Sequence, residues 1–414
     1  MLKRRWGVAA LFAAFLLVVA ACGDDDATTT SAPPTTQAPT TTAAPVTTTM
    51  AGDTTTTTDV PARPAGVPDF CLDIKGAYDV EADGTGVNVG LTFDLLGRGD
   101  QSFNDAAACG VDWAKALFGV TSTEITPTDA AARATDLQLQ AENSQIVIGN
   151  GFSFEAAFPE VCENNPFVNF AITDSGMLNF AFDPPEPYCA NVRGMVFAEH
   201  EGSFLVGVAA ALKTQTGKLG FIGGVSGIGL IEKFEAGFIA GARAVNPDIE
   251  IVSEYITEFP NFGGFGAPDL GREIALAMYD EGADIIYAAA GLSGSGMFAA
   301  AKEFSEAATF PDVPVEKVWG IGVDSDQYLT VDPSQQEYVL TSMNKRVDVA
   351  VFYAIADHLT GNFTAGPTEY DLAADGVGYS TSGGFIDDIV DQLEAYKAQI
   401  VAGEIVVPVL PEDA

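Results

Sequence analysis

Polar and aromatic side chains stand at the ends of several apolar runs in this sequence. Asp94, Asp174 and Asp324 each close or follow such a run, and Phe103 and Asn104 come shortly after Asp94. Carboxylates accept hydrogen bonds, an amide both donates and accepts them, and an aromatic face stacks on a planar ring. These residue types suit the binding of a small polar ligand, if the fold brings the ends of the runs together.

Residues for catalysis are scarce. His200 and His358 are the only two His in the chain, so most His-based metal clusters and His-dependent nucleophilic sites are hard to build. The sequence has no P-loop motif, and segment 149–151 lacks the third glycine of a dinucleotide fingerprint because Phe154 stands at that position. We expect no cofactor and no enzymatic activity.

The net charge argues against polyanionic partners. The 414 residues include 57 Asp and Glu but 19 Lys and Arg, which gives a formal charge of −38. Binding to nucleic acid requires a basic surface that releases counterions from phosphate. The sequence therefore predicts no nucleic-acid partner, and 47% hydrophobic residues with 43 Gly are typical of an α/β globule of two or three domains.

The first 22 residues have the pattern of an export signal. Basic residues at 3–5 precede an apolar stretch at 6–19 that is short for a membrane span, and a small-residue site ends at Cys22. This is the lipobox pattern of bacterial lipoproteins. We expect Cys22 to carry a lipid that anchors the protein to the extracytoplasmic face of the cell membrane; an uncleaved anchor helix is the alternative.

Residues 23–66 form a tract with sixteen Thr and six Pro. It has too few large apolar residues to offset the entropy of ordering, so the sequence predicts a disordered linker. The four later cysteines predict two disulfides with three possible pairings. We favour Cys71 with Cys109 and Cys162 with Cys189, since each pair would then lie within one lobe of the fold described next; four buried free thiols are the alternative.

Short apolar runs alternate with amphipathic stretches from about residue 86. The runs predict buried parallel strands at 87–95, 145–149, 167–172, 218–223, 249–256, 284–289 and 318–323. The amphipathic stretches predict helices at 104–118, 129–143, 201–214, 231–245, 271–282, 297–305, 349–359 and 387–402. This alternation is typical of doubly wound α/β sheets, which bind ligands beyond the carboxyl ends of their strands.

A Pro-rich break at 183–187 indicates two Rossmann-like lobes that face a cleft. We assign residues 67–193, with a return segment at about 324–350, to the first lobe. The second lobe takes residues 194–323 with a return segment at about 351–405, and residues 406–414 form a tail. Two lobes joined in this way can close on a ligand.

Six passages of the sequence resemble one family of lipoproteins. They are residues 100–104, 197–205, 234–238, 290–291, 322–327 and 341–348. Together, over about residues 87–380, they are similar to the basic membrane protein family, whose members are substrate-binding proteins of ABC importers, several of them nucleoside receptors. The resemblance implies a type I periplasmic-binding-protein fold, a purine nucleoside as the favoured ligand and an ABC permease as partner. We expect the receptor to be a monomer.

The resemblance also implies roles for single residues. Phe103 matches the stacking aromatic of the first lobe, and Asp324 matches the acid that accepts both ribose hydroxyls. Lys345 is expected to contact the same sugar. Asp174 matches a position that faces the ligand or the hinge.

Further contacts are expected with the edge of the base and with residues of the second lobe. Asp94 and Asn104 would read the base edge, and Gly294 would let the backbone approach the ligand. The second stacking aromatic is ambiguous because 260–265 looks like an insertion relative to the family. Matching from the upstream strand selects Phe259, which we prefer, and matching from downstream selects Phe265.

Charge narrows the ligand class and leaves alternatives open. Asp94, Asp174 and Asp324, with Lys345 as the main cation, would repel a phosphate, so we expect neutral nucleosides. A receptor for a sugar or another small polar ligand with a sensing role is the alternative. A nucleoside hydrolase with Ca²⁺ at segment 324–326 is a further one, although Asp clusters in so acidic a chain are usually solvated surface.

Overall fold

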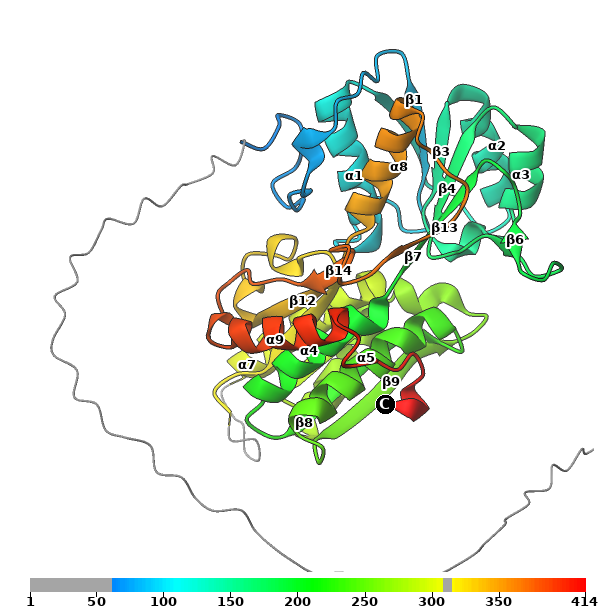
Figure 1. Cartoon of the computed structure of the whole chain (residues 1–414). Helices are drawn as coiled ribbons and strands as arrows, with labels where there is room; N and C mark the ends of the chain where they lie inside the picture. Colours follow the sequence, from blue (N-terminus) through cyan, green and yellow to red (C-terminus); the bar gives the residue numbers. More distant parts are fainter. Residues whose placement is uncertain (1–61, 308–314) are drawn as a thin grey trace, which may run out of the picture. The chain divides into compact units, whose positions relative to one another are not determined.

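The computed structural model describes residues 62–307 and 315–414 (Figure 1). The predicted export signal, Cys22 and nearly all of the predicted linker lie outside these ranges. Arg63, at the end of the predicted linker, donates hydrogen bonds to the carbonyls of Pro68 and Asp69 and pairs with Asp73. The ordered segment therefore begins before residue 67.

The first lobe is built on a six-stranded parallel sheet in the order β13-β7-β4-β3-β1-β2. Its strands are β1 (Asn88–Thr92), β2 (Thr121–Ile125), β3 (Ile146–Gly149), β4 (Asn169–Thr173), β7 (Val192–Phe197) and β13 (Gly366–Tyr370). Helices α1 (Phe103–Phe118) and α8 (Val347–Thr360) pack together on one face, with α2 (Arg133–Asn143) and α3 (Phe158–Asn164) on the other (Figure 1). Because both faces are covered, the central strands are apolar along nearly their whole length.

The second lobe has a sheet in the order β14-β12-β11-β10-β8-β9, parallel except for β14. Its strands are β8 (Lys218–Ser226), β9 (Glu250–Glu258), β10 (Ile285–Ala289), β11 (Trp319–Asp324), β12 (Val339–Lys345) and β14 (Val377–Tyr379). Its helices form two close pairs, α4 (Glu199–Lys213) with α5 (Gly229–Val245) and α6 (Pro268–Asp280) with α7 (Gly294–Glu306), while α9 (Val390–Val401) contacts α4. The two Rossmann-like lobes predicted from the sequence are confirmed.

The chain passes between the two sheets three times, after β7, after β12 and after β13 (Figure 1). The predicted return segments are therefore wrong in part, since β14 and α9 do lie in the second lobe as predicted. β12 pairs with β11 in the second lobe, whereas α8 packs on α1 and β13 pairs with β7 in the first lobe. Periodicity identified the late helices, but the sheet that receives each element is decided by long-range pairing that periodicity does not encode.

The predicted crossing at 183–187 and the predicted tail also differ from the structure. Glu186–Pro187 pairs with Leu178–Asn179 in a small antiparallel hairpin (β6 and β5), and the chain then enters β7 of the same lobe. The first crossing therefore follows Phe197, not residue 193. At the other end, Arg243 donates a hydrogen bond to the carbonyl of Ala414, so the last residues pack against α5.

Two disulfides tie segments within the first lobe, in the favoured pairing. Cys71–Cys109 joins the segment before β1 to α1, and Cys162–Cys189 joins α3 to the segment before β7. The indole nitrogen of Trp113 also donates to the carbonyl of Leu72, at 3.1 Å. Within the described ranges, no helix combines the length and the apolar character needed to cross a membrane.

Candidate functional site

A cavity of about 540 Å³ lies between the two lobes, at the carboxyl ends of their strands. This volume is within the range of about 300 to 1,000 Å³ found for small-molecule sites. Six of the residues predicted from the sequence line it, namely Asp94, Phe103, Asn104, Asp174, Asp324 and Lys345. Phe259 and Gly294 are not part of its lining.

Two aspartates turn into the cavity because their backbones leave the sheet in the left-handed region. Asp174 follows β4 with φ +64°, and Asp324 ends β11 with φ +65°. Asp is one of the few residues other than glycine that adopts this conformation readily. The Oγ of Ser102 donates to Oδ2 of Asp324 at 2.8 Å, and burial raises the pKa of Asp324 above its usual value.

Lys345 connects the lobes. Its Nζ lies 2.6 Å from Oδ1 of Asp174 and 3.6 Å from Oε1 of Glu199. Burial alone would lower the pKa of Lys345, but the charges of Asp174, Glu199 and Asp324 raise it above the ordinary value for a lysine. Lys345 is therefore a fixed cation that three carboxylates surround.

Glu199 and Lys233 belong to this charged cluster and were not predicted from the sequence. Glu199 begins α4 and is fully buried, and the Nζ of Lys233 lies 3.1 Å from its Oε2. A Glu in the first turn of a helix usually looks like a solvated charge that interacts with the helix dipole. The signal available was its place in the 197–205 passage, directly after a strand end.

Phe103 is the first residue of α1 and lies beside the charged cluster. Its ring centroid is 5.0 Å from the Nζ of Lys345, a cation–π distance. A Cβ placed on Gly151 would lie 3.5 Å from the ring of Phe103 and 3.2 Å from Oδ2 of Asp94. The Phe103 ring and the Asp94 carboxylate are therefore neighbours across a glycine that leaves room for a ligand.

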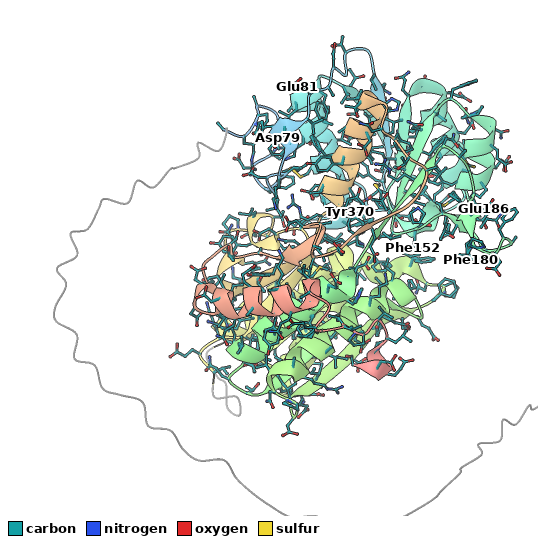
Figure 2. The ribbon with its side chains drawn as sticks, in the orientation of Figure 1. Asp79, Glu81, Phe152, Phe180, Glu186 and Tyr370 are labelled. Carbon is teal, nitrogen blue, oxygen red and sulfur yellow. A yellow bond between two sulfur atoms is a disulfide. The ribbon has the colours of Figure 1, made fainter. Side chains whose placement is uncertain are left out.

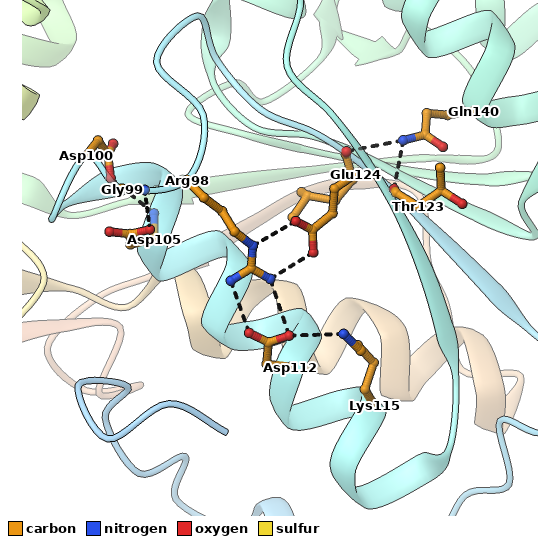
Figure 3. Close-up of polar contacts among 10 residues, drawn as sticks. Arg98, Gly99, Asp100, Asp105, Asp112, Lys115, Thr123, Glu124 and Gln140 are labelled. Carbon is orange, nitrogen blue, oxygen red and sulfur yellow. Dashed lines mark hydrogen bonds and ion pairs between the residues drawn. The ribbon is translucent and has the colours of Figure 1, made fainter. Parts of the chain in front are cut away.

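The loop between β1 and α1 is held in shape by its own acidic residues (Figure 3). The Asp100 carboxylate accepts hydrogen bonds from the backbone amides of Ser102, Asn104 and Asp105, and burial raises its pKa to about 6. Asp105 in turn accepts from the amides of Gly99 and Gln101. The start of α1, and with it Phe103, is therefore fixed without help from a ligand.

Arg98 secures the outer part of the same loop. Its guanidinium donates to both oxygens of Glu124 on β2 and to both oxygens of Asp112 on α1 (Figure 3). Lys115 adds a second cation to Asp112, at 3.3 Å. The Arg-Gly-Asp tripeptide at 98–100 is thus a structural part of the binding loop.

Most of the hydrogen-bonding capacity of Asn104 is used within the protein. Its Oδ1 accepts from the amide of Asp94 and from Nδ2 of Asn150, and its Nδ2 donates to Asp100. The side chain is 2% exposed. Asn104 thus positions Asp94 and Asp100, and the second N–H of its Nδ2 remains for the predicted contact with the base edge.

Arg133 lines the cavity and was missed from the sequence. It is the first residue of α2, and its guanidinium donates to Oδ1 of Asp94 at 3.1 Å. The backbone amide of Leu95 donates to the same oxygen, at 2.8 Å. No sequence signal marked Arg133, because it follows neither a strand end nor a recognisable motif.

Phe259, which the sequence favours as the second stacking aromatic, does not line the cavity. Phe259 is 55% exposed and lies outside the cavity, whereas Phe265 lines it together with Phe262. Both come from η3 (Phe262–Phe265), which the inserted segment forms after β9. The insertion lengthens the connection between β9 and α6. Phe259, the aromatic selected by matching from the upstream strand, therefore comes before the segment that reaches the cavity.

Gly294 also lies elsewhere. It is buried at the start of α7, and the glycine that lines the cavity after β10 is Gly291, with φ +55°. A positive φ favours glycine, and Gly291 contacts Phe265, whose carbonyl would lie 3.3 Å from a Cβ there. The backbone approach expected at Gly294 is therefore possible three residues earlier.

Comparison with known proteins agrees with this architecture. Residues 87–411 match the family model described as ABC transporter substrate-binding protein PnrA-like. The chain is 36% identical to the CD4+ T-cell-stimulating antigen of Listeria monocytogenes, covering 78% of this chain and 88% of that protein. It is 33% identical to the ABC transporter nucleoside-binding protein BmpA of Lactococcus lactis, covering 78% and 90%, and 31% identical to basic membrane protein A of Borreliella afzelii, covering 83% and 92%.

A solved structure shares the fold. The solute-binding protein of an ABC transporter system from Aeropyrum pernix K1 aligns with a TM-score of 0.64 and 27% identity, covering 78% of this chain and 94% of that one. The predicted type I periplasmic-binding-protein fold is confirmed. The chain belongs to the PnrA-like, or basic membrane protein, family of ABC transporter substrate-binding proteins, which bind a small-molecule ligand outside the cytoplasm and work with a permease.

Proposed function

We propose that this protein is a lipid-anchored receptor that binds a neutral purine nucleoside between its lobes and delivers it to an ABC permease. The observation that carries the proposal is the presence, in one cavity, of an aromatic ring from each lobe and a buried carboxylate. Phe103 and Phe265 can enclose the faces of a base, and stacking contributes about 1 to 3 kcal/mol per base. Asp324 can accept hydrogen bonds from both hydroxyls of a ribose.

Charge in the cavity supports a neutral ligand. Four carboxylates line it, those of Asp94, Asp100, Asp174 and Asp324, against two cations, Arg133 and Lys345. Both cations are already paired, with Asp94 and Asp174 respectively. A phosphate would therefore meet uncompensated negative charge at short range. The relative from Lactococcus lactis, which is named a nucleoside-binding protein, supports the same ligand class.

Native mass spectrometry of the purified protein tests the ligand. We expect the folded protein to carry a mass increment equal to a purine nucleoside, which mild unfolding releases. An increment equal to a sugar or an amino acid would contradict the nucleoside proposal.

The lipid anchor is tested separately, by labelling producing cells with a fatty acid. We expect label in the wild-type chain and none in Cys22→Ser. Label that persists in the variant, or a wild type without label, would contradict anchoring at Cys22.

A further inference from the structure

The cavity has a charged floor and an apolar mouth. Lys345 and Asp324 form the floor and are 2% and 8% exposed. At the other side Leu95 and Leu96 line the cavity and are each 39% exposed, so they mark its opening to solvent. The buried end combines these charged groups with the apolar side chains of Phe234 and Val323, whereas the exposed end at Leu95 and Leu96 is apolar.

Two aromatic rings from opposite lobes close the mouth. The rings of Phe152, after β3, and Phe262, on η3, have centroids 6.1 Å apart. Figure 2 labels Phe152 at the level where the two lobes meet. Leu96 reaches across as well, because a Cβ on Gly266 would lie 3.1 Å from its Cδ2. Leu96, Phe152 and Phe262, with Leu95, form what we call the apolar chamber.

Asp94 lies between the floor and the apolar chamber. Arg133 and the amide of Leu95 both use Oδ1 of Asp94, while Oδ2 lies beside Gly151 and the Phe103 ring. A purine stacked on Phe103 with its sugar at Asp324 directs its far edge toward Asp94. An exocyclic N–H on that edge can donate to Oδ2, and any group on the same nitrogen enters the apolar chamber.

We propose that the receptor takes purine nucleosides whose base carries an apolar substituent on the exocyclic amine, remote from the sugar. This rests on the proposed function, whose nucleoside contacts occupy the charged floor and Phe103. An unsubstituted base leaves the apolar chamber to water, whereas an alkyl group buries its surface there. Because Leu95 and Leu96 are partly exposed, a long substituent can extend toward solvent, so the chamber does not set a sharp upper limit on length.

Isothermal titration of the wild-type protein tests the inference with three probes. They are adenosine, adenosine with a butyl chain on its exocyclic amine, and the same chain with a hydroxyl on its second carbon. Each buried methylene strengthens binding about fourfold, so the butyl compound should bind at least tenfold more tightly than adenosine. The hydroxylated chain should lose most of that gain, since its hydroxyl meets no partner in the apolar chamber.

Substitutions test whether the apolar chamber causes the gain in affinity of the butyl compound. The ratio of the adenosine Kd to the butyl-adenosine Kd should fall to near one in Leu96→Ser/Phe262→Ser. It should keep its wild-type value in Phe167→Ser, whose side chain is 98% exposed and lies outside the cavity. If adenosine binds and the butyl compound binds equally or more weakly, the inference is wrong and the proposed function stands. A gain that survives Leu96→Ser/Phe262→Ser also overturns the inference. Absence of binding by all three probes would overturn the inference, and absence of binding by guanosine and inosine as well would overturn the proposed function itself.

Discussion

The Nζ of Lys345 lies 2.6 Å from Oδ1 of Asp174, and this ion pair joins the two lobes. Lys345 ends β12 of the second sheet, and Asp174 follows β4 of the first. The chain crosses between lobes directly after Lys345 and again after Tyr370, which Figure 2 labels where the two lobes meet. The charged floor of the cavity and the hinge thus share residues, so lobe geometry and ligand contacts are set together.

Lys345→Met should destabilise the fold strongly. The change leaves Asp174 buried without its cation and leaves Glu199 with Lys233 alone, and breaking a buried pair in this way costs about 3 to 5 kcal/mol of unfolding free energy. Denaturant unfolding of the ligand-free protein measures the loss. Lys213→Met is the matched control, because its partner Asp388 is exposed, and it should cost less than about 1 kcal/mol. Equal losses in the two variants would contradict the role of Lys345.

The aromatic pair should carry most of the affinity for the base. Phe103→Ala and Phe265→Ala should each weaken nucleoside binding by at least tenfold, about 1.4 kcal/mol, since each removes a stacking face. Phe259→Ala should weaken binding much less, because Phe259 is outside the cavity and meets its lining through an edge contact with Phe262. Titration calorimetry compares the three. Loss of affinity in Phe259→Ala without loss in Phe265→Ala would restore the sequence-based preference.

Nucleoside affinity should fall in acid because of Asp324. Burial raises the pKa of its carboxyl, so protonation begins at a higher pH than for an ordinary Asp. The protonated form cannot accept both ribose hydroxyls, so the Kd should rise as the pH falls from about 7 toward 4, and binding in that range should release protons. Asp324→Asn should bind at least tenfold more weakly at neutral pH and should show a smaller pH dependence.

Asp326→Asn is the control for the pH dependence of the nucleoside Kd. Asp326 is also buried, but it lies outside the cavity and accepts from Ser382, which an asparagine oxygen can replace. This variant should keep the wild-type pH profile of the Kd. A wild-type pH profile in Asp324→Asn would mean that another group governs the acid limb.

The conformation of the β1–α1 loop should depend on Arg98. Arg98→Met removes the four hydrogen bonds that join the loop to Glu124 and Asp112. We expect a several-fold rise in nucleoside Kd, because Leu95, Leu96 and Phe103 are then less well positioned, although Arg98 itself does not line the cavity. Arg272→Met, which breaks an exposed pair with Glu303, should have no effect on Kd. Hydrogen exchange of residues 95–101 should rise in Arg98→Met; an unaltered loop with an unaltered Kd would contradict this role.

Much of the fold was predictable because buried parallel strands leave a strong apolar signal. The runs ending at Asp94, Asp174 and Asp324 became strands whose ends meet at the cavity, since parallel strands gather their carboxyl ends at one edge. Five strands of the two main sheets were missed, namely β2, β7, β12, β13 and β14. β2, β13 and β14 lie at sheet edges. β7 and β12 are buried, but Arg193 and the polar residues at 341–345 interrupt their apolar pattern.

The site residues that escaped prediction depend on three-dimensional neighbours. Arg133 and Glu199 begin helices, where charged residues are common, and only packing shows that they are buried. Asn104 was placed correctly, but its partners Asp100 and Asn150 decide its role. The spacing from the upstream strand favours Phe259 over Phe265, because sequence spacing cannot show how an inserted segment folds back.

Titration of the wild-type protein with a purine nucleoside and with its monophosphate tests the central claim most directly. The account predicts that the nucleoside binds and that the monophosphate binds at least tenfold more weakly, because the cavity's two cations are already paired with carboxylates. Tighter binding of the monophosphate, or no binding of the nucleoside, would contradict it.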